Sequence, residues 1–399
     1  MNEIQRLIHE MCPDGVPMVA LGEIGSLIRG NGLQKKDFVD QGIGCIHYGQ
    51  IYTRFGLFTD KTLAYVSESL ANKLTQVESG NLVIACTSEN VEDVCKCVAW
   101  LGDKTIVTGG HAVVFKHSQN PKYIAYCFTS EDFQTQKRKY AFGAKVIDIK
   151  IDKLASIQIP LPPLPIQQRI VEILDKFTSL VSSLDSEIAL RQKQYEYYRN
   201  KLLSFEGEDI EYKKLGEVCD TLSGFPFDSS KFTNEGIRLM RGMNIKRGYL
   251  DFSEDLNRYW QTSQNLEKYL LEDNDIVMSM DGSLVGKSFA TIEKKHLPLI
   301  LVQRVARIRS TKIDTHYVYQ CIKYNFSDYV DKKKTGGAIP HISMKDIDNF
   351  IIPFPPLDRQ LSIVRTLDTF ESLLTNLKKE RELHQKQYEY YREKLLTFA

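Results

Sequence analysis

The stretch QKQYEYYR occurs twice in this chain, at residues 192–199 and again at residues 385–392. When the match is extended outward without gaps, the blocks 160–205 and 353–398 are identical at 27 of their 46 positions. Two unrelated blocks of this length would share about three residues at average composition. The chain therefore carries an internal duplication, and its period near 193 residues is far too long for a solenoid repeat.

Each copy begins with a proline cluster, PLPPLP at 160–165 and PFPPLD at 353–358. Because proline lacks an amide donor and fixes φ, we expect extended chain there. Apolar residues then recur at alternating steps of four and three, which is the 3.5-residue period of a coiled-coil helix. In the first copy these residues are Ile170, Leu174, Phe177, Val181, Leu184, Ile188, Tyr195, Tyr198, Leu202 and Phe205. In the second they are Ile363, Leu367, Phe370, Leu374, Leu377, Tyr388, Tyr391, Leu395 and Phe398.

One such stripe alone would be typical of an ordinary core helix. Two copies in one chain predict instead that the helices pack against each other, each being roughly 55–60 Å long at about 1.5 Å per residue. Arg191, Arg381 and His384 are polar residues on the two seams, and we expect them to set the register or the choice of helix partner.

Composition limits the class of protein. A chain of 399 residues suggests two or three domains, and 42% hydrophobic residues suffice for packed cores. The net charge of +1 gives no overall basic signature, which counts against nucleic-acid binding unless the basic residues cluster. No apolar run is long enough for a membrane helix and the charged start is no signal peptide, so a cytoplasmic protein without membrane contact is expected. The eight cysteines form no C-x₂₋₄-C pair, which favours buried free thiols over a zinc site.

Globular regions alternate with the two repeat helices. The expected segments are an N-terminal helix and turn at 1–17, a mixed region at 18–159, the central repeat helix at 160–211, a second mixed region at 212–352 and the C-terminal repeat helix at 353–399. Strands are predicted at 81–86, 95–101, 112–115, 275–280, 287–292 and 299–309, and helices at 2–11, 67–76, 121–133 and 314–329. The predicted fold class is α+β, with two mixed α/β domains and two long duplicated helices in an antiparallel, pseudo-twofold coiled coil. The two chain ends should then lie side by side and close a ring.

The two mixed regions keep the same order of elements, although their sequences have diverged. The tetrapeptide LGEI at 21–24 is matched by LGEV at 215–218, at an offset of 194 residues. Nearly identical helices suggest one task performed twice, whereas two divergent domains suggest two different targets.

With its PLPPLPIQQ and PFPPLDRQ segments, its LGEI and LGEV entries and IHYGQIYT at 46–53, the whole chain resembles the specificity subunit of a type I restriction–modification system. The resemblance implies two target-recognition domains, each reading one half of a bipartite sequence in double-stranded DNA. It implies helices that set the spacing and dock two modification (methyltransferase) subunits, with restriction (translocase and nuclease) subunits as further partners. The subunit would then be non-catalytic, and S-adenosylmethionine, ATP and Mg²⁺ would belong to its partners.

Catalytic motifs are correspondingly absent from the sequence. No N/DPPY tetrapeptide of an amino-methyltransferase occurs. The segment GSLVGKS at 282–288 has three residues between its glycines, whereas a phosphate-binding loop needs four, and Asp281 precedes it. We therefore expect a turn between two strands, and neither a nucleotide site nor any catalytic, cofactor or metal site.

Candidate DNA contacts come from clusters of basic and amide side chains. Phosphate contacts suit two basic runs, each after a predicted helix and before glycine, and one lysine in the turn: Lys137, Arg138 and Lys139; Lys332, Lys333 and Lys334; and Lys287. Both runs are expected on flexible basic loops, with a merely solvated surface as the alternative. Base contacts suit aligned positions in the two regions, which could also be ordinary strand ends: His47, Tyr48 and Gln50; and Arg241, Asn244, Lys246 and Arg247.

A different class remains open, namely a non-catalytic structural adaptor that binds two protein partners across a coiled-coil spacer. The basic runs and the divergence between the two mixed regions favour the DNA-binding interpretation.

Overall fold

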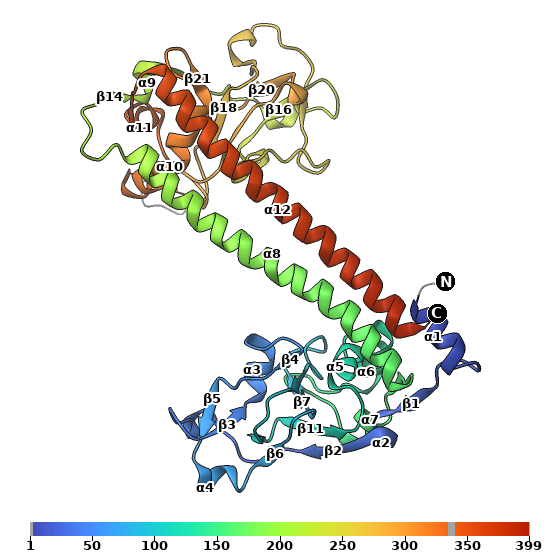
Figure 1. The fold of residues 1–399 in the computed structure, drawn as a ribbon. Coiled ribbons are helices and arrows are strands. Elements are labelled where there is room, and N and C mark those ends of the chain that lie inside the picture. Colours follow the sequence, from blue (N-terminus) through green and yellow to red (C-terminus); the bar gives the residue numbers. More distant parts are fainter. Residues whose placement is uncertain (1–2, 334–339, 399) are drawn as a thin grey trace. The chain divides into compact units, whose positions relative to one another are not determined.

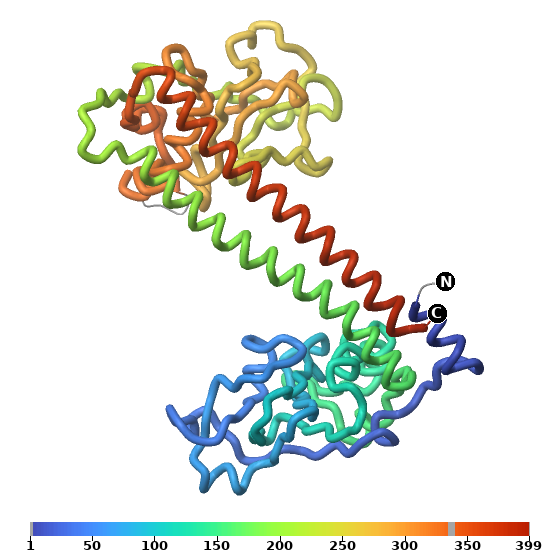
Figure 2. The backbone as a smooth tube through the Cα atoms, viewed as in Figure 1, coloured from blue at the N-terminus to red at the C-terminus, as the bar shows by residue number. Residues whose placement is uncertain are grey.

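The computed structural model describes residues 3–333 and 340–398 (Figures 1 and 2). The chain forms two compact units, Met1–Asp185 with Lys379–Ala399 and Ser186–Lys378. Each unit contains one globular region and parts of both long helices, α8 (Leu164–Ser204) and α12 (Leu357–Thr397). The unit boundaries therefore cut the two helices instead of falling at their ends.

The first unit contains a five-stranded sheet, β2-β11-β7-β9-β4, and a four-stranded sheet, β5-β3-β10-β6. Its helices are α1 (Glu3–Met11), α2 (Leu21–Ile24), η1 (Lys35–Asp37), α3 (Tyr48–Thr53), α4 (Glu68–Ala71), α5 (Pro121–Cys127), α6 (Glu131–Tyr140) and α7 (Ile151–Ala155). Its strands are β1 (Met18–Ala20), β2 (Gly25–Arg29), β3 (Ile43–Ile46), β4 (Phe58–Thr59), β5 (Ala64–Val66), β6 (Thr75–Val77), β7 (Leu82–Ala85), β8 (Thr87–Ser88), β9 (Cys97–Trp100), β10 (Ile106–Thr108), β11 (Ala112–His117), β12 (Ile147–Asp148) and β13 (Gln158–Pro160).

The second unit contains a four-stranded sheet, β15-β21-β18-β19, and a three-stranded sheet, β17-β16-β20. Its helices are α9 (Leu215–Val218), η2 (Ser229–Lys231), η3 (Gly242–Asn244), η4 (Glu267–Tyr269), η5 (Lys294–His296), α10 (Thr315–Lys333) and α11 (Met344–Asp348). Its strands are β14 (Tyr212–Lys214), β15 (Cys219–Ser223), β16 (Ile237–Met240), β17 (Tyr259–Trp260), β18 (Ile276–Ser279), β19 (Phe289–Thr291), β20 (Leu299–Leu301), β21 (Val305–Ser310) and β22 (Ile351–Pro353).

The two globular regions share their strand pairing. In each, a central antiparallel set (β2-β11-β7-β9 or β15-β21-β18-β19) accompanies an equivalent parallel pair in the smaller sheet (β3 with β10, or β16 with β20). The central strands β7 and β18 are buried along their whole length, which agrees with their almost entirely apolar sequences, LVIA and IVMS. The predicted repetition of the element order is confirmed, because the register is conserved even where the side chains are not.

Three predicted elements are wrong in extent because local capping and turns intervene. The helix predicted at 67–76 is only α4, and the chain then enters strand β6. The helix predicted at 121–133 is two helices, because Ser130 Oγ accepts the Phe133 amide and starts α6. The strand predicted at 299–309 is β20 and β21, separated by a turn in which Arg304 has φ 64°.

The long helices run antiparallel within each unit. In the first unit Phe177 stacks on Tyr391 at 5.2 Å between ring centroids, and Arg381 Nε donates to Asp185 at 3.0 Å. In the second unit the same stacking joins Tyr198 and Phe370 at 5.4 Å. The predicted antiparallel pairing is thus confirmed, with equivalent aromatic pairs in both units.

Details of the seam differ from the predicted heptads near its ends and centre. Leu203 and Leu396 are buried at the helix ends, and the neighbouring Leu202 and Leu395 are only partly buried. Arg191 bonds to Glu187 of its own helix at 2.7 Å, so it does not reach across the seam.

Equivalent hydrogen bonds attach each globular region to a long helix. Tyr123 Oη donates to the carbonyl of Pro160 at 2.8 Å, and Tyr317 Oη donates to that of Pro353 at 3.2 Å. The amides of Gln167 and Gln360 each donate at 2.8 Å to a carbonyl of the adjacent proline cluster. The proline clusters therefore join sheet and helix through buried polar contacts.

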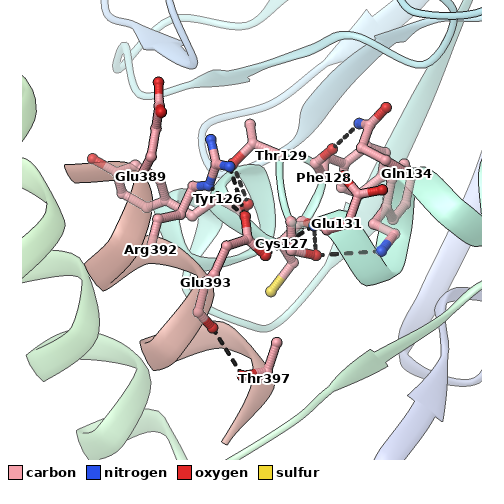
Figure 3. A network of polar contacts seen from close by, with 12 residues as sticks. Tyr126, Cys127, Phe128, Thr129, Glu131, Gln134, Glu389, Arg392, Glu393 and Thr397 are labelled. Carbon is pink, nitrogen blue, oxygen red and sulfur yellow. Dashed lines mark hydrogen bonds and ion pairs between the residues drawn. The ribbon is translucent and has the colours of Figure 1, made fainter. Parts of the chain in front are cut away.

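The end of α12 packs on the corner between α5 and α6 in the first unit (Figure 3). The Glu131 amide, at the start of α6, donates to Glu393 Oε2 at 3.0 Å, and Arg392 bonds to the other oxygen of that carboxylate at 2.6 Å. Ile4 of α1 shares a core with Leu396 of α12. The first and last described helices therefore lie together, as the ring closure requires, while residues 1, 2 and 399 lie outside the described part.

All eight cysteines are buried free thiols, as predicted. Within residues 3–333 and 340–398, no helix has the length and hydropathy needed to cross a membrane. The same residues hold no group of three or more His, Cys, Asp or Glu side chains suited to a metal ion.

Candidate nucleic-acid interface

The predicted base-reading positions lie where a buried strand ends and a short helix begins. Strand β3 leads into α3 through His47, and β16 leads into η3 through Arg241. Both junctions are closed by side chains that cap the first turn of the helix, which satisfies amide groups that no helical carbonyl can reach. The alignment of the two positions is confirmed by this shared geometry.

In the first region, two of the three predicted side chains take part in this capping. His47 Nδ1 accepts the Gly49 amide at 3.2 Å, and Gln50 Oε1 accepts the His47 amide at 3.0 Å. Burial, with Lys35 and His111 nearby, lowers the pKa of His47, which keeps the ring neutral as the acceptor requires. His47 and Gln50 therefore serve the fold, while Tyr48 stands between the rings of His47 and His111, 4.5 and 4.7 Å from their centroids.

In the second region, the Asn244 side chain caps the first turn of η3 in the same way. Its side chain is fully buried, accepts the Arg241 amide at 3.2 Å and donates to the carbonyl of Asp251 at 3.0 Å. Lys246 lies 3.5 Å from the Asp251 carboxylate, and Arg247 is exposed. Asn244 therefore has no free group for a base contact, while Arg241, Lys246 and Arg247 remain candidates for contacts to DNA.

Arg241 and Lys246 line a cleft of about 610 Å³ in the second unit. Burial, followed by the nearby Arg258, lowers the pKa of Arg241. Gln303 and Arg304 also line the cleft, and neither residue belongs to a sequence motif that would have predicted this position. Guanidinium and amide groups of this kind match base edges in the major groove.

The run 137–139 lies in α6 and not on a loop, so that prediction is wrong. Lys137 is 1% exposed, its Nζ donates to the carbonyl of Glu92 at 3.0 Å, and burial lowers its pKa. Arg138 is exposed but paired with Glu131 at 2.7 Å, whereas Lys139 is exposed. Lys137 is therefore a structural residue, since the helical repeat turns it inward while its two neighbours face outward.

The second run also belongs to a helix. Lys332 and Lys333 are exposed in the last turn of α10, where positive charge is favourable next to the free carbonyls. Lys334 and the glycines at 336 and 337 lie outside the described residues. The predicted turn between the strands at 275–280 and 287–292 is confirmed, although the second strand, β19, begins only at Phe289. Lys287 is exposed, and its amide donates to the carbonyl of Leu284 at 2.9 Å.

A matching set of side chains lies at the end of the central strand in each region. In the first region Thr87 Oγ1 is 3.0 Å from His111 Nδ1, and Arg29 is bonded to Asp148 at 3.2 Å. In the second, Asp281 Oδ2 accepts from Arg304 at 2.8 Å. No sequence motif marks these residues, because strand pairing alone brings them together.

A family model described as "Type I restriction modification DNA specificity domain" matches the chain twice, at residues 13–190 and 207–385. The EcoR124I/EcoR124II specificity subunit of Escherichia coli is 36% identical over 256 residues, 61% of this chain and 63% of that protein. The chain therefore covers less than two thirds of this relative. The MjaVIII specificity subunit of Methanocaldococcus jannaschii is 26% identical over 369 residues, 82% of each protein.

A solved structure shows the same fold at low sequence identity. The crystal structure of the S subunit of a type I restriction–modification system from M. genitalium aligns with a TM-score of 0.60 and 16% identity. The alignment covers 95% of this chain and 96% of that chain.

Proposed function

The chain belongs to the family of type I restriction–modification DNA specificity proteins, and on this premise we propose that it is a sequence-specific DNA-binding subunit. Each globular region reads one half of a bipartite target in double-stranded DNA. The observation that carries this proposal is that the family model matches once on each globular region and that both regions share one strand pairing. Two domains that share their strand pairing but differ in their side chains suit the recognition of two different half-sites.

The exposed faces of the repeat helices supply docking surfaces for partner subunits. Leu190 and Tyr197 of α8 are 63% and 60% exposed, and their counterparts Leu383 and Tyr390 of α12 are 62% and 60% exposed. Each pair is spaced by seven residues, so both side chains fall on one side of the helix. Because the two surfaces are duplicated almost without change, each suits the same partner, and we assign them to two modification subunits.

The same helices set the separation of the half-sites. Both α8 and α12 continue without interruption from one compact unit into the other. An unbroken helix has a fixed rise of about 1.5 Å per residue, which gives it the properties of a spacer.

The chemistry of the system resides in the partners under this proposal. Methylation, ATP-dependent translocation and cleavage, together with S-adenosylmethionine, ATP and Mg²⁺, belong to the modification and restriction subunits. The role of this chain is to bind DNA and to assemble the complex.

A gel-shift titration of the full chain against duplex DNA at several salt concentrations tests DNA binding. Contacts to several phosphates should make the logarithm of the binding constant fall steeply and linearly with the logarithm of salt concentration. Replacing residues 18–159 by the equivalent region of a relative should then change one half-site and leave the other unchanged.

Two outcomes would contradict the proposal. If the chain bound protein partners but no DNA, it would be a structural adaptor. If the replacement altered both half-sites together, the two regions would not be separate readers.

A further inference from the structure

The two globular regions carry different chemistry at three equivalent positions. The Cys86 amide donates to the carbonyl of His111 at 3.0 Å, and the Met280 amide donates to the carbonyl of Arg304 at 2.9 Å. Strand register therefore makes His111 and Arg304 equivalent. The residue that follows Cys86 along the chain is Thr87, and the residue that follows Met280 is Asp281.

A third segment completes the set in both regions. Thr87 pairs antiparallel with Asp148, and Asp281 pairs antiparallel with His341. The first region thus presents Thr87, His111 and Asp148 where the second presents Asp281, Arg304 and His341. Since the backbone pairing is the same, the difference lies in the side chains alone.

Asp281 fixes the direction of the Arg304 side chain. Asp281 Oδ2 accepts from Arg304 Nη1 at 2.8 Å, while Oδ1 lies 2.5 Å from His341 Nδ1. The carboxylate side chain is 18% exposed, whereas the arginine side chain is 68% exposed. A guanidinium has five N–H donors, so a single bond to Asp281 leaves others free on a side chain that lines the cleft.

The backbone at Arg304 has an unusual conformation for a residue with a side chain. Its φ is 64°, in the left-handed region that disfavours residues with a Cβ. Glycine would make this turn without steric cost. The Arg304 side chain therefore stands at a position where glycine would be the less strained residue.

The equivalent residue of the first region, a histidine, has fewer free hydrogen-bonding groups than Arg304. His111 Nδ1 is 3.0 Å from Thr87 Oγ1, so only Nε2 remains for a ligand, and the ring packs at 4.7 Å from that of Tyr48. The third residue, Asp148, is occupied by Arg29 at 3.2 Å. One ring nitrogen can form a single hydrogen bond to a base edge, whereas a guanidinium can form two.

We propose that Arg304 is a specificity-determining residue whose free donor pair binds a guanine edge in the second half-site. His111 is its counterpart in the first region and makes a single, less selective contact. The inference rests on the proposed DNA-binding function. Its physical basis is that the arginine fork matches O6 and N7 of guanine.

The test compares the full chain with its Arg304→Gly and Arg304→Lys variants, by selection from randomised duplexes and by methylome sequencing of cells carrying the complete system. Both variants should accept other bases at one position of the second half-site, with a loss of discrimination on the order of 10- to 100-fold. The first half-site should stay unchanged. Lysine keeps the charge but lacks the fork, so it should retain more total affinity than glycine.

Asn274→Gly provides the matched control. Asn274 is exposed, also adopts a left-handed conformation at φ 69°, and does not line the cleft. Both glycine variants should melt close to the wild type, because relief of an unfavourable φ offsets the lost side-chain contacts and the added flexibility of the unfolded chain, but only Arg304→Gly should relax specificity. The lysine variant keeps the test decisive if the glycine variant fails to fold.

Two results would overturn the inference without touching the proposed function. One is a wild-type second half-site that contains no guanine on either strand. The other is an Arg304→Lys variant that discriminates at every position as the wild type does. Failure of the wild type to select any sequence would instead contradict the proposed function itself.

Discussion

The first and second globular regions have the same strand register and bond in the same way to the proline segments that precede the long helices. Tyr123 and Tyr317, which bond to the carbonyls of Pro160 and Pro353, are examples of this shared framework. The regions differ at the rim of the sheet, where His111 of one corresponds to Arg304 of the other. The two regions can thus share their strand pairing while exposed residues at the sheet end differ, because the backbone hydrogen bonds do not depend on those side chains.

The largest effects are expected where the two units are the same. Leu174 and Leu367 occupy equivalent seam positions and are both fully buried. Replacing either with alanine should lower the free energy of unfolding of its unit by about 2–5 kcal/mol, through lost burial and the cavity left behind. Hydrogen exchange resolved by unit measures this effect.

Matched controls sharpen that prediction. Leu180 and Leu373 lie on the same helices and are each 38% exposed. Changing either to alanine should lower the free energy of unfolding by less than about 1 kcal/mol, because less buried apolar surface is lost. A large difference between the Leu174 and Leu367 variants would break the equivalence of the two seams.

An intermediate effect is expected where the regions differ in an ionisable group. His117 of β11 pairs with Gly25, and its equivalent in β21 is Ser310, which pairs with Cys219. Burial lowers the pKa of His117 to about 4. Because the folded state holds this proton less tightly than the unfolded chain, the stabilisation is complete above about pH 6.5 and is lost as the pH falls toward 4.

The first unit should therefore lose about 1–2 kcal/mol of stability between pH 7 and pH 5 on account of His117. The protein has two tryptophans, Trp100 and Trp260, one in each globular region. Denaturant unfolding of a Trp260→Phe background, followed by Trp100 fluorescence, measures the pH slope of the first region. Adding His117→Ser should flatten this slope, and an unchanged slope would contradict the prediction.

The smallest effect is expected at the duplicated exposed surfaces. Tyr197→Ala and Tyr390→Ala should each weaken the binding of a modification subunit by about 1 kcal/mol, roughly fivefold, because buried tyrosines often contribute most to an interface. Calorimetric titration measures the affinity, and Tyr197→Phe and Tyr390→Phe, which keep the ring, should bind nearly as the wild type does. Unequal losses at the two tyrosines would show that the surfaces meet different partners.

The docking prediction has a clear negative outcome. If both alanine variants assembled with modification subunits as tightly as the wild type, these surfaces would not be the docking sites. Melting curves of the free variants should match that of the wild type, since both side chains are 60% exposed.

Several features followed from the sequence alone because they depend on short-range periodicity. The alternating apolar steps determined two long helices, and their duplication determined that the helices pair, as the stacking of Phe177 on Tyr391 confirms. The buried, unpaired state of the cysteines also followed from their spacing. Element ends were less predictable, because a single side chain such as Ser130 can start a new helix.

The tertiary structure decided which polar residues are free to bind a ligand. Lys137 was a reasonable phosphate contact by composition, but the turn of α6 points it at the carbonyl of Glu92. Asn244 has an amide group of the kind that contacts bases, but this group caps the first turn of η3 instead. Arg304 carries no motif and reaches the cleft rim only because β21 pairs with β18. Availability depends on hydrogen-bond partners supplied by distant parts of the chain, and local sequence does not contain that information.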